Sequence, residues 1–164
     1  MNGYLSLLQK CTFAVKFSIM KKLIFTLITF CFVAASQAQI LNPVTFNYSV
    51  VKKGTDLYEV HVKAMLEPKW HIYSVNNPGG GALATAIKIN DGKVVGAVKE
   101  KGKMKTAFEK EFGVNQKYFE GNVDFVQMVK LKPGNKKISG TVNYMVCNDR
   151  QCLPPKEVEF KIKM

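Results

Sequence analysis

The sequence predicts an all-β sandwich formed by a single domain, and two features of its 164 residues indicate this fold class. Apolar and polar residues alternate with a period of two in several short runs, as they do in strands that bury one face. Residues that favour turns separate these runs about every 8 to 12 residues, so we expect about seven to nine short strands. Such spacing is typical of two antiparallel sheets packed face to face.

The N-terminal region is expected to direct export. Lys21 and Lys22 precede an apolar run at residues 23–35, and residues 36–38 provide small side chains for a cleavage site. A basic segment, an apolar segment and such a site together predict a secretory signal peptide at residues 20–38. The apolar run is shorter than a membrane span needs, so we expect no membrane-spanning segment here.

The expected cleavage divides the chain into three parts. We interpret Met20 as the natural start and residues 1–19 as a misannotated upstream extension, followed by the signal peptide at residues 20–38. Residues 39–164 then form the mature chain, whose length corresponds to one domain. Two of the four cysteines precede residue 39 and would be lost with the leader. The two that remain would lie in an oxidising compartment.

The first half of the mature chain has the pattern of strands joined by turns. Residues 46–50 and 58–66 alternate apolar and polar side chains around a Gly-Thr-Asp turn at residues 54–56, which predicts a hairpin. A further strand is expected at residues 70–75. The glycines of the irregular segment 76–81 can adopt backbone angles that other residues avoid, so we expect a loop there.

The next part of the chain contains one segment that is ambiguous. Residues 87–89 and 94–98 are apolar and flank an Asn-Asp-Gly turn, which predicts two short strands. Residues 103–111 are compatible with a short helix bracketed by glycines. Residues 118–132 form a long run rich in strand-forming side chains, and a Pro-Gly-Asn turn closes it.

Cys147 and Cys152 lie in a polar turn between two alternating runs, residues 137–146 and 157–163. These runs predict a hairpin with the cysteines at its tip. Strand side chains alternate between two faces, so Cys147 lies opposite to Val146 and points away from the expected core. We expect that core to be built from Tyr48, Val60, Val62, Phe125, Val129, Val142, Tyr144 and Phe160.

The cysteine spacing allows three interpretations. A zinc site is disfavoured, because about four ligands are needed and the mature chain adds only His61 and His71 to its two thiols. A structural disulfide that closes so short a loop contributes about 2 kcal/mol, and a domain of this size can bury a core without it. A redox pair is the third interpretation, since an exposed disulfide in a constrained loop is easy to attack. Spacing alone leaves the structural and redox interpretations open.

Charge and motif content exclude several other classes of function. The net charge is +12, but the lysines are scattered except at residues 99–105, and no aromatic residues interleave with them as in a nucleic-acid surface. We therefore expect a solvated basic face and no nucleic-acid partner. The chain has no G-x-S-x-G, H-E-x-x-H or P-loop motif, so hydrolase, metalloprotease and P-loop chemistry are not predicted. His61 is expected to be solvated, whereas His71 is compatible with a packed or a pocket-edge position.

The cysteine tip carries a family resemblance. Its sequence at residues 144–155 is Tyr-Met-Val-Cys-Asn-Asp-Arg-Gln-Cys-Leu-Pro-Pro, and Trp-His-Ile-Tyr precedes it at residues 70–73. Together these segments resemble the N-terminal periplasmic domain of the thiol:disulfide interchange protein DsbD, also called the disulphide bond corrector family. The resemblance extends over about residues 44–163. It implies an immunoglobulin-like sandwich in the periplasm that receives electrons from a membrane-embedded reductase and passes them to thioredoxin-like proteins by disulfide exchange.

The resemblance also implies roles for individual residues. Cys152 corresponds to the cysteine that forms the mixed disulfide with a partner, and Cys147 corresponds to the one that resolves it. Tyr73 and His71 match an aromatic strand behind this pair. Phe112 matches the aromatic residue of a cap loop that shields the cysteines.

Two expectations about partners follow from the resemblance. Disulfide exchange of this kind requires no bound cofactor and no metal. The chain carries no counterpart of the transmembrane and thioredoxin-like parts of longer relatives, so we expect its electron donor to be another polypeptide, a membrane-embedded thiol reductase acting in trans. The alternative function is a non-enzymatic β-sandwich binding or accessory module that contains a structural disulfide.

Overall fold

Nine strands and their connections make up residues 41–164, the part of the chain that the computed structural model describes. The strands are β1 (Val44–Lys52), β2 (Leu57–Leu66), β3 (His71–Tyr73), β4 (Ala86–Ile89), β5 (Lys93–Glu109), β6 (Val114–Lys130), β7 (Lys137–Tyr144), β8 (Val146–Cys147) and β9 (Lys156–Lys163). Within residues 41–164 no helix is long and apolar enough to cross a membrane. The expected signal peptide, the upstream extension and the two N-terminal cysteines lie outside the described residues.

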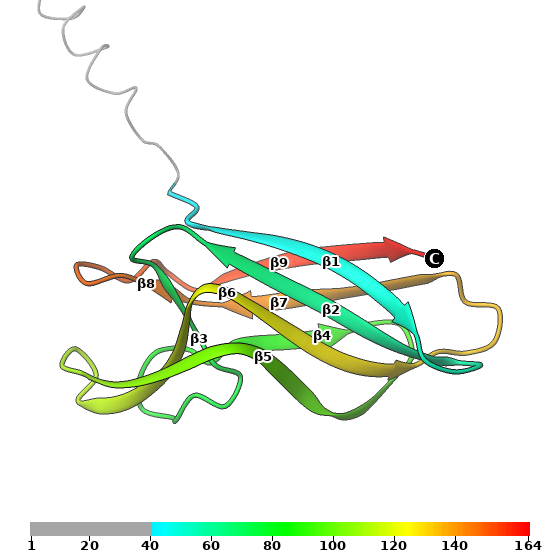
Figure 1. The fold of residues 1–164 in the computed structure, drawn as a ribbon, viewed down its shortest axis with the longest axis horizontal. Coiled ribbons are helices and arrows are strands. Elements are labelled where there is room, and N and C mark those ends of the chain that lie inside the picture. Colours follow the sequence, from blue (N-terminus) through cyan, green and yellow to red (C-terminus); the bar gives the residue numbers. More distant parts are fainter. Residues whose placement is uncertain (1–40) are drawn as a thin grey trace, which may run out of the picture. The chain divides into compact units, whose positions relative to one another are not determined.

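The strands form two antiparallel sheets packed on one another (Figure 1). The larger sheet has the order β1-β2-β6-β3-β8, and β5 also pairs with β6. The smaller sheet has the order β4-β7-β9. The core between them combines side chains of both sheets, such as Val62 and Phe125 from the larger and Val142 and Phe160 from the smaller. The predicted all-β sandwich is therefore confirmed.

β1 and β2 form the predicted hairpin, with Val50 opposite Val60. All of the expected core residues are buried except Tyr48, which is partly buried and packs against the core. Its ring stacks on that of Phe160, with the ring centroids 4.8 Å apart. This stack joins the outermost strand of the larger sheet to β9 of the smaller sheet.

β5 and β6 form a long hairpin, and the short helix considered for residues 103–111 is wrong. β5 continues as a strand to Glu109, and Met104 lies opposite Phe119 of β6. Pairing with β6 satisfies the backbone groups of this segment, so tertiary context overrides its weak helical pattern. Gly102 allows the close approach of the two strands, because a Cβ atom there would lie 3.1 Å from the carbonyl oxygen of Asn122.

β7 and β9 form the predicted hairpin of the smaller sheet. At Met145, which follows β7, the chain leaves this sheet, and β8 joins the larger sheet beside β3. His71 of β3 thereby lies directly opposite Cys147 of β8. The cysteine tip is thus held by both sheets rather than extending freely from one hairpin.

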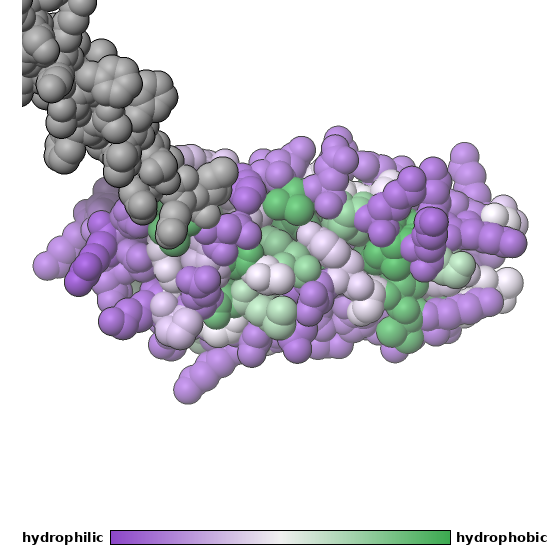
Figure 2. Space-filling model, turned by 90° about the horizontal axis from the view of Figure 1, so that it is seen from above, coloured by the Kyte–Doolittle hydropathy of each residue, from purple (hydrophilic) through white to green (hydrophobic). Residues whose placement is uncertain are grey.

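One face of the molecule is largely polar. Figure 2 shows hydrophilic side chains around the edges of one face, with several hydrophobic areas between them. The lysines at residues 99–105 are exposed on β5, which pairs only with β6 and forms an edge of the larger sheet. Charged side chains on an edge strand hinder pairing with a strand of another molecule. These lysines are solvated, as the sequence led us to expect.

Candidate functional site

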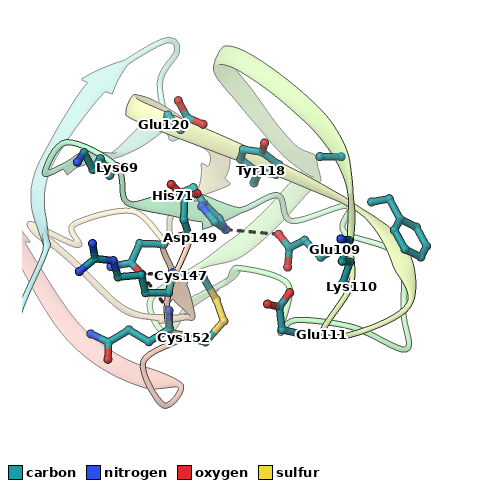
Figure 3. Close-up of a pocket in the computed structure, with 15 residues that line it drawn as sticks. Lys69, His71, Glu109, Lys110, Glu111, Tyr118, Glu120, Cys147, Asp149 and Cys152 are labelled. Atoms are coloured by element: carbon teal, nitrogen blue, oxygen red, sulfur yellow. Dashed lines mark hydrogen bonds and ion pairs between the residues drawn. A yellow bond between two sulfur atoms is a disulfide. The ribbon is translucent and has the colours of Figure 1, made fainter.

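Cys147 and Cys152 are joined by a disulfide bond, and their Cα atoms are 4.0 Å apart (Figure 3). Asn148 organises the loop between them. Its side-chain oxygen accepts hydrogen bonds from the backbone N–H groups of Arg150 and Gln151, each at 2.9 Å. Its own backbone N–H donates to the carbonyl oxygen of Gln151, also at 2.9 Å. An asparagine that bonds the backbone ahead of it fixes a tight turn, so the loop is ordered by its own sequence.

The two cysteines differ in their accessibility. Cys147 is only 2% exposed, whereas Cys152 is exposed. Cys147 does point away from the main core, as the alternation predicted, because Val146 occupies that side. It is nevertheless buried, because a second and smaller cluster of side chains covers it.

This second cluster is assembled from distant parts of the chain. Tyr73 and Ala82 are buried in it together with Cys147, and three partly buried side chains pack against them: Phe112, Tyr118 and Met145. Tyr73 comes from β3 and Ala82 from the loop that precedes β4. The cluster therefore shields one sulfur of the disulfide and leaves the other accessible.

Three polar groups lie behind the disulfide. The Tyr73 hydroxyl donates a hydrogen bond to the Glu109 carboxylate, at 2.9 and 3.1 Å from its two oxygens. Nε2 of His71 lies 3.2 Å from that hydroxyl and 3.4 Å from the carboxylate, the contact drawn as a dashed line in Figure 3. Glu109 is the last residue of β5, so these contacts tie the end of that strand to β3.

Burial shifts the pKa values of both ring side chains in this group. Desolvation is the main cause that raises the pKa of Tyr73, and the hydrogen bond to Glu109 raises it further, so the hydroxyl stays protonated and donates. Desolvation also lowers the pKa of His71, although the nearby carboxylates of Glu109, Glu120 and Asp149 oppose that shift. The imidazole is therefore biased towards its neutral form.

The turn between β5 and β6 reaches the disulfide. The backbone N–H groups of Phe112 and Gly113 donate to the carbonyl oxygen of Glu109, at 3.2 and 2.9 Å. Gly113 has a φ of 68°, a left-handed conformation that glycine adopts without steric cost. The turn directs the partly buried Phe112 ring against the cluster that covers Cys147. The Phe112 ring therefore lies against the same side chains that cover Cys147.

An open cavity of about 640 Å³ lies beside the disulfide. Cys147 and Cys152 are both in its wall, and Phe108, which is 60% exposed, lies at its edge. The charged residues that line it are Lys69, Glu109, Lys110, Glu111, Glu120, Asp149 and Arg150. Four of these side chains are carboxylates and three are cations, so a molecule that reaches Cys152 meets charge of both signs.

The structure brings all of the residues singled out from the sequence into one region: Cys147, Cys152, His71, Tyr73 and Phe112. Sequence reasoning missed Glu109 and Asn148. Asn148 carried a usable signal, because asparagine at the start of a short polar turn often bonds the backbone ahead of it. Glu109 carried none, since its partner Tyr73 is 36 residues away and the strand that bears it was mistaken for a helix.

His61 takes no part in this site. Its Nδ1 atom lies 2.8 Å from the carboxylate of Asp124, and its Nε2 atom lies 3.6 Å from that of Glu59. The expectation of a freely solvated histidine is wrong, because the neighbouring strand supplies an acidic partner. Among residues 41–164 no group of three or more His, Cys, Asp or Glu side chains is arranged to hold a metal ion.

Comparison with known proteins gives one family match. The family model described as thiol:disulfide interchange protein DsbD, N-terminal, matches residues 37–163. No curated protein sequence matches the chain significantly.

Solved structures show the same fold. The N-terminal periplasmic domain of ScsB from Proteus mirabilis is similar with a TM-score of 0.59 and 14% identity, and the match covers 75% of this chain and 47% of that one. The DsbD N-terminal domain of Neisseria meningitidis in its reduced form matches with a TM-score of 0.57 and 17% identity, and the match covers 76% of this chain and 90% of that one. A complex of the DsbD and PilB N-terminal domains from Neisseria meningitidis matches with a TM-score of 0.51 and 19% identity, and this match covers 75% of this chain and 87% of that one. These similarities confirm the immunoglobulin-like β-sandwich.

Proposed function

Because the chain belongs to the family of DsbD N-terminal domains, we propose that it is an exported thiol:disulfide interchange domain whose redox pair is Cys147 and Cys152. It takes reducing equivalents from a membrane-embedded thiol reductase in trans and passes them to thioredoxin-like proteins of the periplasm. No cofactor is needed, since the two sulfur atoms carry the electrons.

The unequal exposure of the two sulfur atoms is the observation that carries this proposal. An incoming thiolate can reach Cys152, which is exposed, but not Cys147, which the second cluster covers. Disulfide exchange depends on access to one particular sulfur atom and on which thiolate leaves. A purely structural disulfide has no need for one accessible sulfur beside an open cavity.

Reduction of the domain follows from this geometry. A thiolate of the donor attacks the sulfur of Cys152, the bond to Cys147 breaks, and Cys147 leaves as a thiolate that takes up a proton. The second thiolate of the donor then attacks the donor sulfur of this mixed disulfide and releases the Cys152 thiolate. The donor ends as a disulfide and the domain as a dithiol, so two electrons have moved.

Transfer to the acceptor runs in the same way. The Cys152 thiolate attacks the acceptor disulfide and forms a mixed disulfide, while one acceptor sulfur leaves as a thiolate. Cys147 then attacks Cys152, re-forms the bond between the two cysteines, and releases the acceptor as a dithiol. Cys147 needs no contact with solvent for this step, because its target is the adjacent sulfur.

Selective trapping tests the proposal. Cys147→Ser should accumulate reductant-sensitive covalent complexes with an oxidised thioredoxin-like protein, because Cys152 attacks but nothing resolves the product. Cys152→Ser should trap far less, because its remaining thiol is buried, and the double Cys→Ser variant is the control for non-covalent association. Equal trapping by the two single variants, or trapping by neither, would contradict the assigned roles.

The relatives support a function in which the domain docks another protein. One DsbD N-terminal domain similar to this chain has been solved in complex with a PilB N-terminal domain, so a domain of this fold can dock another protein. The family model supports thiol:disulfide interchange as the general activity. Export to the periplasm rests on the signal peptide expected from the sequence.

A further inference from the structure

Lys69 adopts an unusual backbone conformation at the mouth of the site. Its φ is 72°, and within residues 41–164 it is the only residue other than glycine with a positive φ. The Trp70 N–H donates to the carbonyl oxygen of Glu67 at 3.1 Å, which closes a four-residue turn with Pro68 and Lys69 at its centre. The third position of such a turn favours glycine, because a side chain there crowds the backbone.

Internal contacts do not account for a lysine at this position. Lys69 is exposed, and no ion pair within residues 41–164 includes it. Residues held in sparsely populated backbone conformations cluster at functional sites, where the side chain serves a purpose that offsets the strain. Lys69 lines the cavity beside Cys152, so its side chain is available to a molecule that enters there.

The turn also gives Lys69 a fixed place relative to the disulfide. Trp70 is buried in the core and begins the segment that leads into β3. His71, two residues after Lys69, pairs with Cys147. The lysine backbone is therefore held at a constant offset from the redox pair rather than on a flexible loop.

Lys69 shares its side of the cavity with Glu120, and Figure 3 shows both away from Glu109 and Glu111. The Glu120 carboxylate is already paired with Lys105, at 2.7 Å, so Lys69 is the charge on this side that is left for an incoming molecule. Asp149 and Arg150 are adjacent in the cysteine loop and of opposite charge, so together they contribute little net charge. The wall formed by the hairpin turn carries an excess of carboxylates instead.

We propose that Lys69 is a specificity-determining residue of the exchange reaction, and that it pairs with a carboxylate beside the reactive cysteine of a partner protein. The inference rests on the proposed function, because it concerns which partners reach Cys152. It assigns the partner class by charge: thioredoxin-like proteins with an acidic group next to the cysteine that attacks or is attacked. Lys69 acts on docking and takes no part in electron transfer itself.

The test compares two synthetic thiol peptides, one with glutamates and one with lysines on both sides of a single cysteine, as reductants of the oxidised mature protein. Each rate constant is divided by the rate constant for dithiothreitol, which carries no charge and corrects for changes in the disulfide itself. The ratio of the rate constant for the acidic peptide to that for the basic peptide should fall in Lys69→Gly and Lys69→Asn at low ionic strength. The expected decrease is about two- to fivefold, the range for an exposed ion pair. The difference should shrink as salt is added.

Three comparisons keep the test specific. Lys69→Arg retains the charge and should keep the wild-type ratio of the two peptide rate constants. Lys63→Gln changes an exposed lysine outside the cavity and should also leave this ratio unchanged. Lys69→Gly should unfold at a denaturant concentration equal to or above that of the wild type, because glycine relieves the backbone strain. A lower midpoint would show that Lys69 has a structural role and would overturn the inference.

The outcomes separate this inference from the proposed function. If the wild-type protein exchanges disulfides with a thioredoxin-like protein but the peptide ratio is the same in all Lys69 variants, the inference is wrong and the proposed function stands. If the wild-type protein exchanges with no thioredoxin-like protein, the proposed function fails, and the inference fails with it.

Discussion

The Tyr73 hydroxyl donates a bifurcated hydrogen bond to the two oxygens of the Glu109 carboxylate, at 2.9 and 3.1 Å, which joins the strand behind the disulfide to the end of β5. Tyr73 is fully buried, so the bond is protected from water on the tyrosine side. Beyond Glu109 the chain turns and presents Phe112 to the cluster over Cys147. The same hydrogen bond therefore anchors the start of the turn that carries Phe112.

Tyr73→Phe should loosen the turn that carries Phe112. The substitution removes a hydrogen bond to a charged group, which contributes about 1.5 to 3 kcal/mol, and leaves His71 as the remaining contact of Glu109 in this group. We expect a lower free energy of unfolding, by about that amount, and faster alkylation of the reduced cysteines. Tyr118→Phe, which removes a hydroxyl from the neighbouring strand but not this bond, is the matched control. Equal effects in the two variants would show that the bond does not hold the turn.

Phe112→Ala should increase the rate at which a small alkylating reagent labels the reduced cysteines. The ring packs against the cluster that covers Cys147, so its removal opens that side to solvent. Phe108→Ala is a matched control, because Phe108 is 60% exposed and does not belong to the cluster. The measurement is the labelling rate in native buffer, with near-ultraviolet circular dichroism to verify the fold. An unchanged rate in Phe112→Ala would place the shield elsewhere, with Tyr73 the next candidate.

The stability of the protein should decrease as the pH falls below about 6.5. Burial lowers the pKa of His71 in the folded state, so the unfolded state binds the proton more readily. The folded state therefore has its full stability above the ordinary histidine pKa of 6.5. Its free energy of unfolding decreases as the pH falls from there towards the lower pKa that His71 has in the folded state. Denaturant unfolding at several pH values between about 7 and 5 measures this slope.

His71→Gln is the variant that isolates this contribution, because glutamine does not titrate. Its free energy of unfolding should depend less on pH over the same interval than that of the wild type. Asp91 and Glu59 do not contribute to the pH dependence in this interval. Their pKa values are lowered in the folded state, so the stability that they provide is lost only at more acidic pH, as the pH falls below the ordinary carboxyl pKa. A slope that persists in His71→Gln would assign the effect to another group.

Asn148→Ala should raise the reduction potential of the disulfide. The asparagine oxygen accepts two backbone hydrogen bonds that order the loop between the cysteines and hold the sulfur atoms together. If the loss disfavours the oxidised form by about 1 kcal/mol, the potential rises by about 20 mV. Asn148→Asp keeps an acceptor oxygen and should change the potential much less. Equal shifts in the two variants would mean that the loop hydrogen bonds do not contribute.

Local sequence patterns predicted the parts of the fold whose pairing is also local. The β1–β2 and β7–β9 hairpins follow from alternation on both sides of a turn, and the core residues expected in β2, β7 and β9 are buried. Residues 103–111 were misjudged because the segment between two glycines is compatible with a short helix, while the partner that makes it a strand lies in β6. A single segment carries no information about such a partner.

In the site, too, the features within one short segment could be predicted, whereas contacts between distant segments could not. The cysteines, their turn and the aromatic strand were all visible in short motifs. The burial of Cys147 was not, because Tyr73 and Ala82, which cover it, lie more than 60 positions earlier in the chain. Lys69 was overlooked for a different reason, since its significance comes from its backbone angle and not from its residue type.

The reduction potential of the mature protein is the measurement that tests the redox account most directly. The protein is equilibrated in buffers of defined thiol and disulfide content, and the fractions of the oxidised and reduced forms are quantified after acid quenching and alkylation. The exposed Cys152 and the short loop predict a potential above about −300 mV and a reduced form that remains folded, because exchange domains must be stable in both states. A potential well below about −300 mV, or a reduced form that unfolds in buffer, would contradict the account and identify the bond as structural.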